Sequence, residues 1–223
     1  MPQLLAFDVY GTLIDTHGVV TALREFVGDK APAFSALWRE KQLEYSFRRG
    51  LMRRYQTFNV CVEQALDYCC QAFQLPLNVE DKTTLLQIYS ALPAFSDAVS
   101  GLDQLAERGF RMVAFSNGTA AAVRGLLEKA NVDQYFEDII SVDEVGSFKP
   151  NPDVYRHLLN RCQSEAAASW LISSNPFDVI GALGVSMSAA WVKRSGDAVF
   201  DPWEYAPTLT VASLDELADK LRP

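Results

Sequence analysis

The sequence predicts an α/β protein with a doubly wound parallel sheet and an inserted all-helical cap domain. Three observations indicate this fold class. After residue 93, short apolar runs alternate with helical segments, as in parallel strands joined by right-handed crossovers. One further apolar run, Gln3 to Asp8, stands alone near the start of the chain. Between them, residues 19–91 keep a helical pattern that no strand interrupts.

The first strand is predicted from the run QLLAFD, which ends in a carboxylate and precedes the turn signal Tyr10-Gly11-Thr12. The segment that follows contains one long helix around residues 37–51. Two more helices are predicted over Cys61 to Phe73 and Lys82 to Leu92. We expect residues 14–93 to form the cap domain, inserted between the first strand and the next helix of the core.

Four further strands are predicted from short apolar runs: Arg111 to Phe115, Asp138 to Val142, Ser169 to Ile172 and Ser188 to Val192. Helical segments alternate with them: Ser96 to Arg108, Thr119 to Ala130, Pro152 to Arg161 and Asp178 to Leu183. Ser96 and Thr119 are expected to cap helix starts, and Gly109 to follow a helix end. Residues 1–13 and 94–223 therefore form a predicted Rossmann-like core domain, in which ligands bind beyond the carboxyl ends of the strands.

Composition excludes several classes of protein. The 223 residues are 49% hydrophobic, which is ordinary for a soluble globular protein of one domain with an insertion. The 28 acidic and 20 basic residues give a net charge of −8, which argues against a nucleic-acid partner. No apolar run approaches the roughly 18 residues of a membrane span. The first residues lack a basic leader, so we expect no signal peptide.

The four cysteines have neither a CxxC spacing nor a regular disulfide framework: Cys61, Cys69, Cys70 and Cys162. We expect them to be reduced packing residues, and the protein to be cytoplasmic.

Polar residues follow four of the predicted strands. Asp8 ends the first, and Ser116 and Asn117 end the second at a helix start whose N–H groups could bind an anion. Lys149 precedes a proline that favours an extended backbone. Residues 173–178 (SSNPFD) offer two hydroxyls, an amide and one carboxylate. Taken singly, these features fit plainer roles, such as a capping Asp, a capping loop or a solvated Lys.

Taken together and in order, FDVYGT, FSNG, KP and SSNPFD resemble the four motifs of the haloacid dehalogenase (HAD) superfamily. The segment ALWREKQLEY, residues 36–45, is similar to the cap helix of the L-2-haloacid dehalogenases, also called type II (S)-2-haloacid dehalogenases. That helix has a substrate-binding Arg in the family, at the position of Arg39 here. The resemblance covers nearly the whole chain and implies a HAD-type core.

The resemblance implies hydrolysis of short L-2-haloalkanoic acids to D-2-hydroxy acids through an aspartyl ester, with inversion at C2. Asp8 is then the nucleophile, and the other implied catalytic residues are Thr12, Arg39, Lys149, Tyr155, Ser173, Asn175 and Asp178. Thr12 orients Asp8, Tyr155 supports the Lys149 region, and Asp178, positioned by Ser173 and Asn175, activates water. The substrate-binding residues are Val9 and Tyr10 through their amides, together with Ser116, Asn117, Arg39 and Phe177.

Tyr10 distinguishes this chain from the phosphatases of the superfamily. They have a second Asp there, which protonates an alkoxide leaving group, whereas a halide is a weak base and leaves without a proton. Asp178 is the only carboxylate of the fourth motif, so a hard cation finds few ligands. We therefore expect no metal and no cofactor, with Lys149 neutralising Asp8 instead.

Two positions depart from the family pattern, which usually has Trp at Phe177 and Gln at Glu40. A Mg²⁺-dependent small-molecule phosphatase and a non-catalytic binding protein of the same fold remain the alternatives. A Ser-His-Asp hydrolase is excluded, because neither His17 nor His157 follows a strand and no G-x-S-x-G motif occurs.

The expected partner is the small 2-haloacid, without nucleic acid or membrane. Apolar residues on the long cap helix, Trp38, Tyr45 and Leu51, also favour a homodimer, as in the resembling family.

Overall fold

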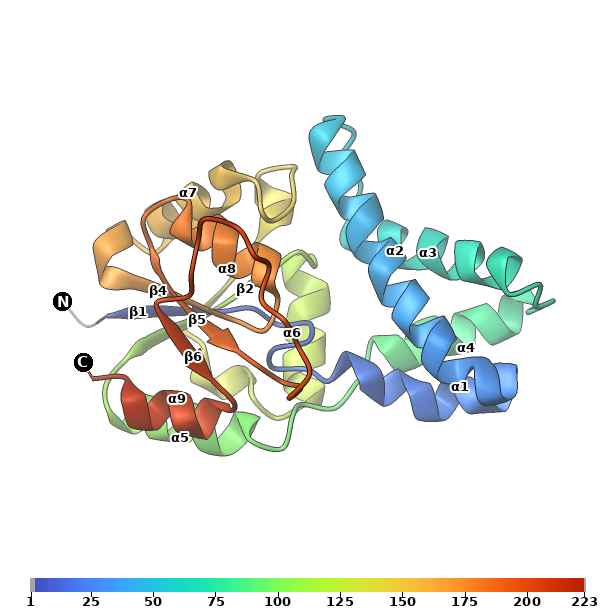
Figure 1. Cartoon of the computed structure of the whole chain (residues 1–223), viewed down its shortest axis with the longest axis horizontal. Helices are drawn as coiled ribbons and strands as arrows, with labels where there is room; N and C mark the ends of the chain where they lie inside the picture. The colour runs from blue at the N-terminus through green and yellow to red at the C-terminus, as the bar shows by residue number, and fades with distance from the viewer. Residues whose placement is uncertain (1–2, 223) are drawn as a thin grey trace.

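A computed structural model describes residues 3–222. Within them, six parallel strands form one sheet in the order β3-β2-β1-β4-β5-β6, with helices on both sides (Figure 1). The strands are β1 Leu4–Phe7, β2 Arg111–Ser116, β3 Asp138–Ser141, β4 Ser169–Ser173, β5 Ser188–Val192 and β6 Leu209–Val211. The predicted doubly wound α/β class is confirmed.

The central strand β1 places the first motif where the sheet can bind a ligand. It pairs with β2 on one side and β4 on the other, so that Phe7 lies opposite both Ala114 and Ile172. All four residues of β1 are buried, because helices cover both faces of the sheet. The strand order reverses direction between β1 and β4. Asp8, directly after β1, therefore lies at the topological switch point.

The core helices are α5 Ala98–Glu107, α6 Ala120–Lys129, α7 Pro152–Arg161, α8 Pro176–Leu183 and α9 Leu214–Lys220. Helices α7 and α8 lie on one side of the sheet, and α5 and α9 lie on the other (Figure 1). Gly101 permits the close approach of α5 to α9, since a Cβ there would lie 2.5 Å from Cβ of Leu214.

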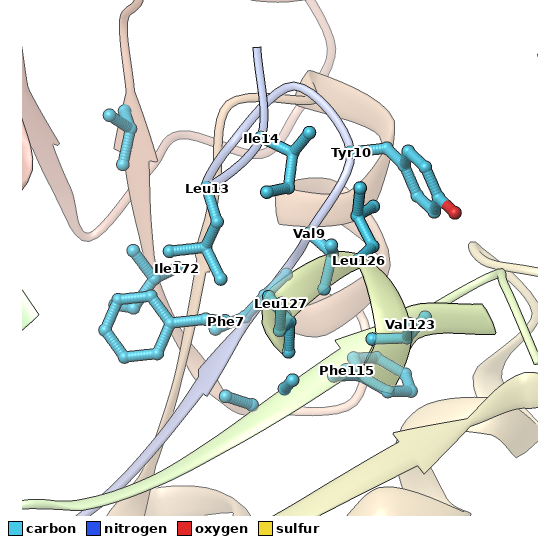
Figure 2. Close-up of a cluster of buried hydrophobic side chains, with 14 of the residues drawn as sticks. Phe7, Val9, Tyr10, Leu13, Ile14, Phe115, Val123, Leu126, Leu127 and Ile172 are labelled. Carbon is cyan, nitrogen blue, oxygen red and sulfur yellow. The ribbon is translucent and has the colours of Figure 1, made fainter. Parts of the chain in front are cut away.

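A buried apolar cluster fixes the loop after β1 (Figure 2). Phe7, Val9 and Leu13 are fully buried, and Val9 lies beside Leu126 and Leu127 of α6. The ring of Tyr10 points away from this cluster, as Figure 2 shows. The backbone of the loop is therefore held by packing on one side, while Tyr10 projects from it.

Four helices between β1 and α5 lie together beside the core (Figure 1): α1 Val19–Val27, α2 Ala31–Leu51, α3 Phe58–Ala72 and α4 Val79–Tyr89. At 21 residues, α2 is about 31 Å long. Its Trp38 is 1% exposed and donates from Nε1 to the Val62 carbonyl of α3 at 2.9 Å. Trp38 is thus a packing residue of the cap and cannot contribute to a dimer surface, whereas Leu51 is 88% exposed.

The two chain segments that join the cap helices to the core lie side by side. Ile14 and Ala94 form an antiparallel bridge, the Asp15 N–H donates to the Pro93 carbonyl at 2.9 Å, and the Phe95 N–H donates to the Leu13 carbonyl at 2.9 Å. The limits of the cap domain, 14–93, stay a prediction.

The sequence prediction was wrong at some ends and left out three elements. Helix α1 lies in the segment of helical pattern, 19–91, but was not predicted as a separate helix. Strand β6 and helix α9 were not predicted, because three and seven residues are too few for a clear period. Ser96 does not cap α5, whose N-cap is Asp97, whereas the Thr119 hydroxyl does accept from the Ala122 N–H. Gly109 follows α5 at φ +80°, as expected of a helix end.

The structure also tests the predictions for the cysteines, the histidines and a membrane-spanning helix. All four cysteines are free and buried, as predicted. His17 is exposed in the short helical turn Thr16–Gly18, and His157 lies within α7, so neither is at a strand end. Along residues 3–222, no helix is both long and apolar enough to cross a bilayer.

Candidate active site

One lysine joins two carboxylates at the carboxyl edge of the sheet. Nζ of Lys149 lies 3.1 Å from Oδ1 of Asp8 and 2.8 Å from Oδ2 of Asp178, and it also donates to the Phe115 carbonyl at 2.8 Å. Lys149 is 1% exposed and Asp178 is fully buried. The three N–H donors of the ammonium thus have three acceptors, so the group is fixed in place. Its charge offsets one of the two carboxylates.

The second oxygen of Asp8 is held by neutral donors. Oδ2 accepts from the Thr12 hydroxyl and from the Asn175 amide, each at 2.8 Å. The Asn175 amide also donates to the Tyr10 carbonyl at 3.2 Å. These bonds, with that of Lys149, define one orientation for the carboxylate, which is what in-line attack on a bound substrate requires.

Burial raises the pKa of Asp178, and the nearby Asp8 charge acts in the same direction, while Lys149 opposes the shift. The Tyr155 hydroxyl donates to Oδ1 of Asp178 at 2.7 Å. Burial also raises the pKa of Tyr155 well above its ordinary value, so the phenol stays neutral and acts as a donor. Asp178 is therefore a stronger base than an exposed aspartate, yet held by two partners.

The predicted roles around Asp178 need correction. Its side-chain partners are Lys149 and Tyr155, and not Ser173 and Asn175. The Ser173 hydroxyl accepts from the Asn175 N–H at 3.1 Å and so shapes the turn, while the Asn175 side chain serves Asp8. Tyr155 supports Asp178 and is one contact removed from Lys149.

Sequence reasoning missed Ser174, which joins the first and fourth motifs. Its N–H donates to the Thr12 hydroxyl at 2.8 Å, and its own hydroxyl donates to the Gly11 carbonyl at 2.7 Å. Gly11 has φ +88°, a conformation that favours glycine. The double serine of the motif was the available signal, but only the paired loops show which serine reaches Thr12.

The second motif positions the lysine loop. The Asn117 side-chain oxygen accepts from the Lys149 N–H at 3.0 Å, which leaves the NH₂ group of this amide as the donor for a ligand. The Ser116 hydroxyl, fully buried, accepts from the Gly118 N–H at 3.1 Å. Both residues lie near Asp8 in the fold, because β2 and β1 are neighbours.

Arg39 reaches the core from helix α2. Its Nη2 donates to the Tyr10 carbonyl at 3.3 Å. Its Nη1 is buried and has no hydrogen-bond partner within the described part of the chain. A buried donor without an acceptor costs roughly 1–3 kcal/mol, so this position favours an anion or a water as its partner. Glu40, the departure beside it, is exposed and so points away from the core.

Tyr10 forms an aromatic contact between the core and the cap. Its ring stacks on Tyr89 of α4, with centroids 6.1 Å apart, and lies 5.8 Å from the ring of Phe58 on α3. Burial raises the pKa of Tyr10, so its phenol is neutral. Phe177 packs edge-on against Phe47 of α2, at 5.1 Å, and thus also faces the cap.

A divalent cation does not fit this donor set. The HAD fold implies Mg²⁺ in its phosphatases, held by acidic side chains. Here the Lys149 ammonium lies between Asp8 and Asp178, in hydrogen-bond contact with both, and Tyr10 replaces the second acid. Over residues 3–222, no group of three or more His, Cys, Asp or Glu side chains is arranged to hold a metal ion.

A switch-point carboxylate held by a lysine, facing an arginine from a helical cap, defines a capped α/β hydrolase. The chain belongs to the haloacid dehalogenase-like hydrolase family, whose model matches residues 2–185. It is 35% identical over 210 residues to an (S)-2-haloacid dehalogenase of Pseudomonas sp. (strain YL), which covers 94% of this chain and 90% of the relative. It is 34% identical to the haloacetate dehalogenase H-2 of Moraxella sp. (strain B), with 96% of both chains covered.

A solved structure agrees with these relatives. The L-2-haloacid dehalogenase from Xanthobacter autotrophicus with chloropropionic acid covalently bound superposes with a TM-score of 0.90 at 29% identity. The match covers 98% of each chain.

Proposed function

We propose that this protein hydrolyses short L-2-haloalkanoic acids to D-2-hydroxy acids without a metal. The main support is the arrangement of Asp8 between Lys149, Thr12 and Asn175, below a cap arginine with an unpaired N–H group. The relatives named above are an (S)-2-haloacid dehalogenase and a haloacetate dehalogenase.

In the first step, the substrate carboxylate binds the N–H groups of Val9 and Tyr10 and the side chains of Ser116 and Asn117. A carboxylate oxygen of Asp8 then attacks C2 from the side opposite the halogen. A carbon–oxygen bond forms as the carbon–halogen bond breaks, and the halide leaves with the bonding pair. This single in-line displacement inverts C2 and produces an ester of Asp8.

The departing halide gains negative charge and needs donors, not a proton. Arg39 supplies Nη1, the Asn117 amide supplies its NH₂ group, and the edge of Phe177 adds a positive ring edge. Because its pKa is raised, the phenol of Tyr10 is a poor proton donor. This suits a leaving group as weakly basic as a halide, which departs without a proton.

In the second step, water attacks the carbonyl carbon of the Asp8 ester and gives a proton to Asp178. The tetrahedral intermediate expels the 2-oxygen of the product, which takes that proton. Asp8 is left as a carboxylic acid that carries the other hydrogen of the water, and it is regenerated as a carboxylate when this proton is lost to solvent. The raised pKa of Asp178 makes it a better proton acceptor than an ordinary aspartate. Lys149, bound to both carboxylates, stabilises negative charge in both steps.

Chloride release from L-2-chloropropionate in excess EDTA tests the proposal. We expect turnover that EDTA leaves unchanged, D-lactate as product, and no turnover by Asp8→Asn. Arg39→Ala should lose most of the dehalogenation. Mg²⁺-dependent hydrolysis of an aryl phosphate, without halide release, would instead identify a phosphatase.

We also propose that the protein is cytoplasmic, since its four cysteines are free. The homodimer remains a prediction that now depends on Leu51 and Tyr45, and size-exclusion chromatography with light scattering tests it.

A further inference from the structure

Gln42 of helix α2 is fully buried, which is unusual for a glutamine. It lies three residues after Arg39, so the two side chains leave the helix on the same face. Its Oε1 accepts from the Tyr89 hydroxyl at 2.8 Å, whereas its Nε2 is buried and has no hydrogen-bond partner among residues 3–222. Because a buried donor without an acceptor is costly, we expect a further partner at Nε2.

A small cavity adjoins both Gln42 and Arg39. Its volume is about 10 Å³, which is the size of a site for one water molecule. Arg39 also has an unpaired buried donor, Nη1, and the buried side chains of Thr16 and Ser35 on the cavity wall have hydroxyl oxygens that can accept. Two N–H donors and two hydroxyl acceptors match the four hydrogen bonds of a water molecule, whereas an anion would use only the donors.

Gln42 is itself held in one orientation by Tyr89. The ring of Tyr89 stacks on that of Tyr10, with centroids 6.1 Å apart, and contacts the ring of Trp38 at 5.0 Å. Burial raises the pKa of Tyr89, so its phenol is neutral and gives its one hydrogen to Gln42. The charge of Arg39 opposes that shift in pKa, because the guanidinium lies close to this hydroxyl.

Arg39 has only one restraint from the core. Its Nη2 donates to the Tyr10 carbonyl at 3.3 Å, a long hydrogen bond that leaves the guanidinium free to turn about it. A second restraint, at Nη1, would fix the guanidinium plane. Nη1 has two N–H groups, so that one can bind a water molecule in the cavity while the other points to the departing halide.

From these observations we propose that Gln42 is a positioning residue for Arg39, and that it acts through one water molecule bound in this cavity. Tyr89 fixes Gln42, and Gln42 fixes the guanidinium through the water. The inference rests on the proposed function, because it concerns the arginine that stabilises the departing halide.

Gln42→Met tests the inference with L-2-chloropropionate and L-2-bromopropionate. Methionine is nearly as long as glutamine but has no amide donor. The value of kcat/KM reports the reaction up to carbon–halogen cleavage, its first irreversible step. Chloride is the poorer leaving group and depends more on Arg39. We therefore expect kcat/KM to fall about tenfold for the chloride and about threefold for the bromide.

The ratio of the two kcat/KM values isolates the effect on the leaving group. Both substrates have the same carboxylate and form the same ester of Asp8, so a loss of folded protein or slower ester hydrolysis affects both alike. Ser46→Ala is the matched control and should leave the ratio unchanged. Ser46 is also buried on α2, but its hydroxyl donates to the Leu43 carbonyl and it does not line the cavity.

Two further variants test the connection to Arg39. In an Arg39→Lys background, Gln42→Met should no longer alter the ratio, since lysine has no second nitrogen to position. Tyr89→Phe keeps the stacked ring but removes the hydroxyl that holds Gln42, so it should shift the ratio in the same direction by about twofold. If Gln42→Met does not fold, Tyr89→Phe decides the question.

The outcomes separate the two proposals. An unchanged ratio in the deciding variant, or a change that persists in the Arg39→Lys background, would overturn the inference alone, because the native protein still releases halide. A crystal structure without a water molecule within hydrogen-bond distance of Nε2 of Gln42 and Nη1 of Arg39 would do the same. No halide release by the native protein from either substrate would overturn the proposed function as well.

Discussion

At the scale of single residues, Asp178 is the group that we propose as the proton acceptor in ester hydrolysis. Burial raises its pKa, and the hydrogen bonds from Lys149 and Tyr155 oppose that shift by stabilising the ionised form. The group must be ionised to accept a proton from water, so activity increases as the pH rises through its pKa.

Tyr155→Phe removes the phenol hydroxyl that donates to Asp178 at 2.7 Å. The pKa of Asp178 should rise further, and the acid side of the kcat–pH profile should move to higher pH. Loss of this charge-assisted bond should also lower kcat roughly tenfold. Steady-state kinetics of chloride release from pH 4 to 9 would measure both effects. An unshifted profile would show that Tyr155 has only a packing role.

The residue scale also shows what the sequence could predict of the site. Asp8, Lys149 and Asp178 follow strands, and parallel strands bring their carboxyl ends to one edge, so their proximity was predictable. Which donor serves which carboxylate was not predictable, because Ser173 ends β4 and Asn175 precedes α8, and both offer a donor close to the two carboxylates. Side-chain direction in that turn sends Asn175 to Asp8 and leaves Asp178 to Tyr155.

At the scale of elements, the contact of α7 with α8 fixes the position of Tyr155. Gly181 of α8 leaves space for that ring, since a Cβ there would lie 2.3 Å from the Tyr155 hydroxyl oxygen and 2.7 Å from Cζ. A side chain at this position would therefore have to displace the phenol that supports Asp178.

Gly181→Ala should accordingly lower kcat about tenfold or more, although alanine favours a helix over glycine. The acid side of the kcat–pH profile should shift as in Tyr155→Phe, because the same hydrogen bond is lost. Gly125→Ala provides the control, since a Cβ on that helical glycine has nothing within 4 Å. Equal kcat in both glycine variants would contradict this account.

Arg194, which follows β5, connects four elements near the nucleophile loop. It pairs with Asp97 at 2.6 Å, donates to the Thr12 carbonyl at 2.5 Å, and lies over the ring of Phe95 at 4.1 Å. Asp97 in turn accepts from the Leu214 N–H at 2.7 Å, at the start of α9. The loop that orients Asp8 is thus joined to the segment that returns from the cap.

Arg194→Lys keeps a cation beside Asp97. A lysine has no planar guanidinium, so it cannot donate to Asp97 and to the Thr12 carbonyl from two separate nitrogens. We expect kcat to fall about fivefold with little change in thermal midpoint. Arg194→Met also leaves Asp97 without its partner, and should cost a further 1–3 kcal/mol or so of unfolding free energy. Thermal and urea unfolding, with kinetics, would separate these effects. If Arg194→Lys lowered the unfolding free energy as much as Arg194→Met does, the two effects would not be separable and this account would be wrong.

The elements differ in how far the sequence predicts them. Helix α7 has the predicted bounds, Pro152–Arg161, because an N-terminal proline and a strong apolar period mark it. Helix α4 begins at Val79, earlier than predicted, since Asn78 and Asp81 form a capping box ahead of the apolar period. Strand β6 pairs only with β5 at the sheet edge, where three residues leave little pattern to detect.

At the scale of the whole molecule, the buried carboxylate affects stability as well as catalysis. Because the pKa of Asp178 is raised in the folded chain, the folded state binds more protons than the unfolded state between the ordinary pKa of 3.8 and the raised value. The stability from this group is therefore complete below the ordinary pKa and is lost as the pH rises through the folded-state pKa.

Asp178→Asn removes this dependence. The unfolding free energy of the native protein should therefore decrease relative to that of the variant as the pH rises above 3.8. Urea unfolding at a series of pH values measures the difference. A constant difference between the two proteins across the series would contradict the raised pKa.

The antiparallel bridge between Ile14 and Ala94 has a consequence for engineering and descent. The chain segments that lead into and out of the cap lie beside each other. A core that gains or loses the cap helices therefore needs to close only a short gap. Grafting a cap from another capped hydrolase between these two positions should therefore leave the sheet intact while exchanging the walls that face the nucleophile. New substrate ranges can arise in this way without any change to the chemistry beneath.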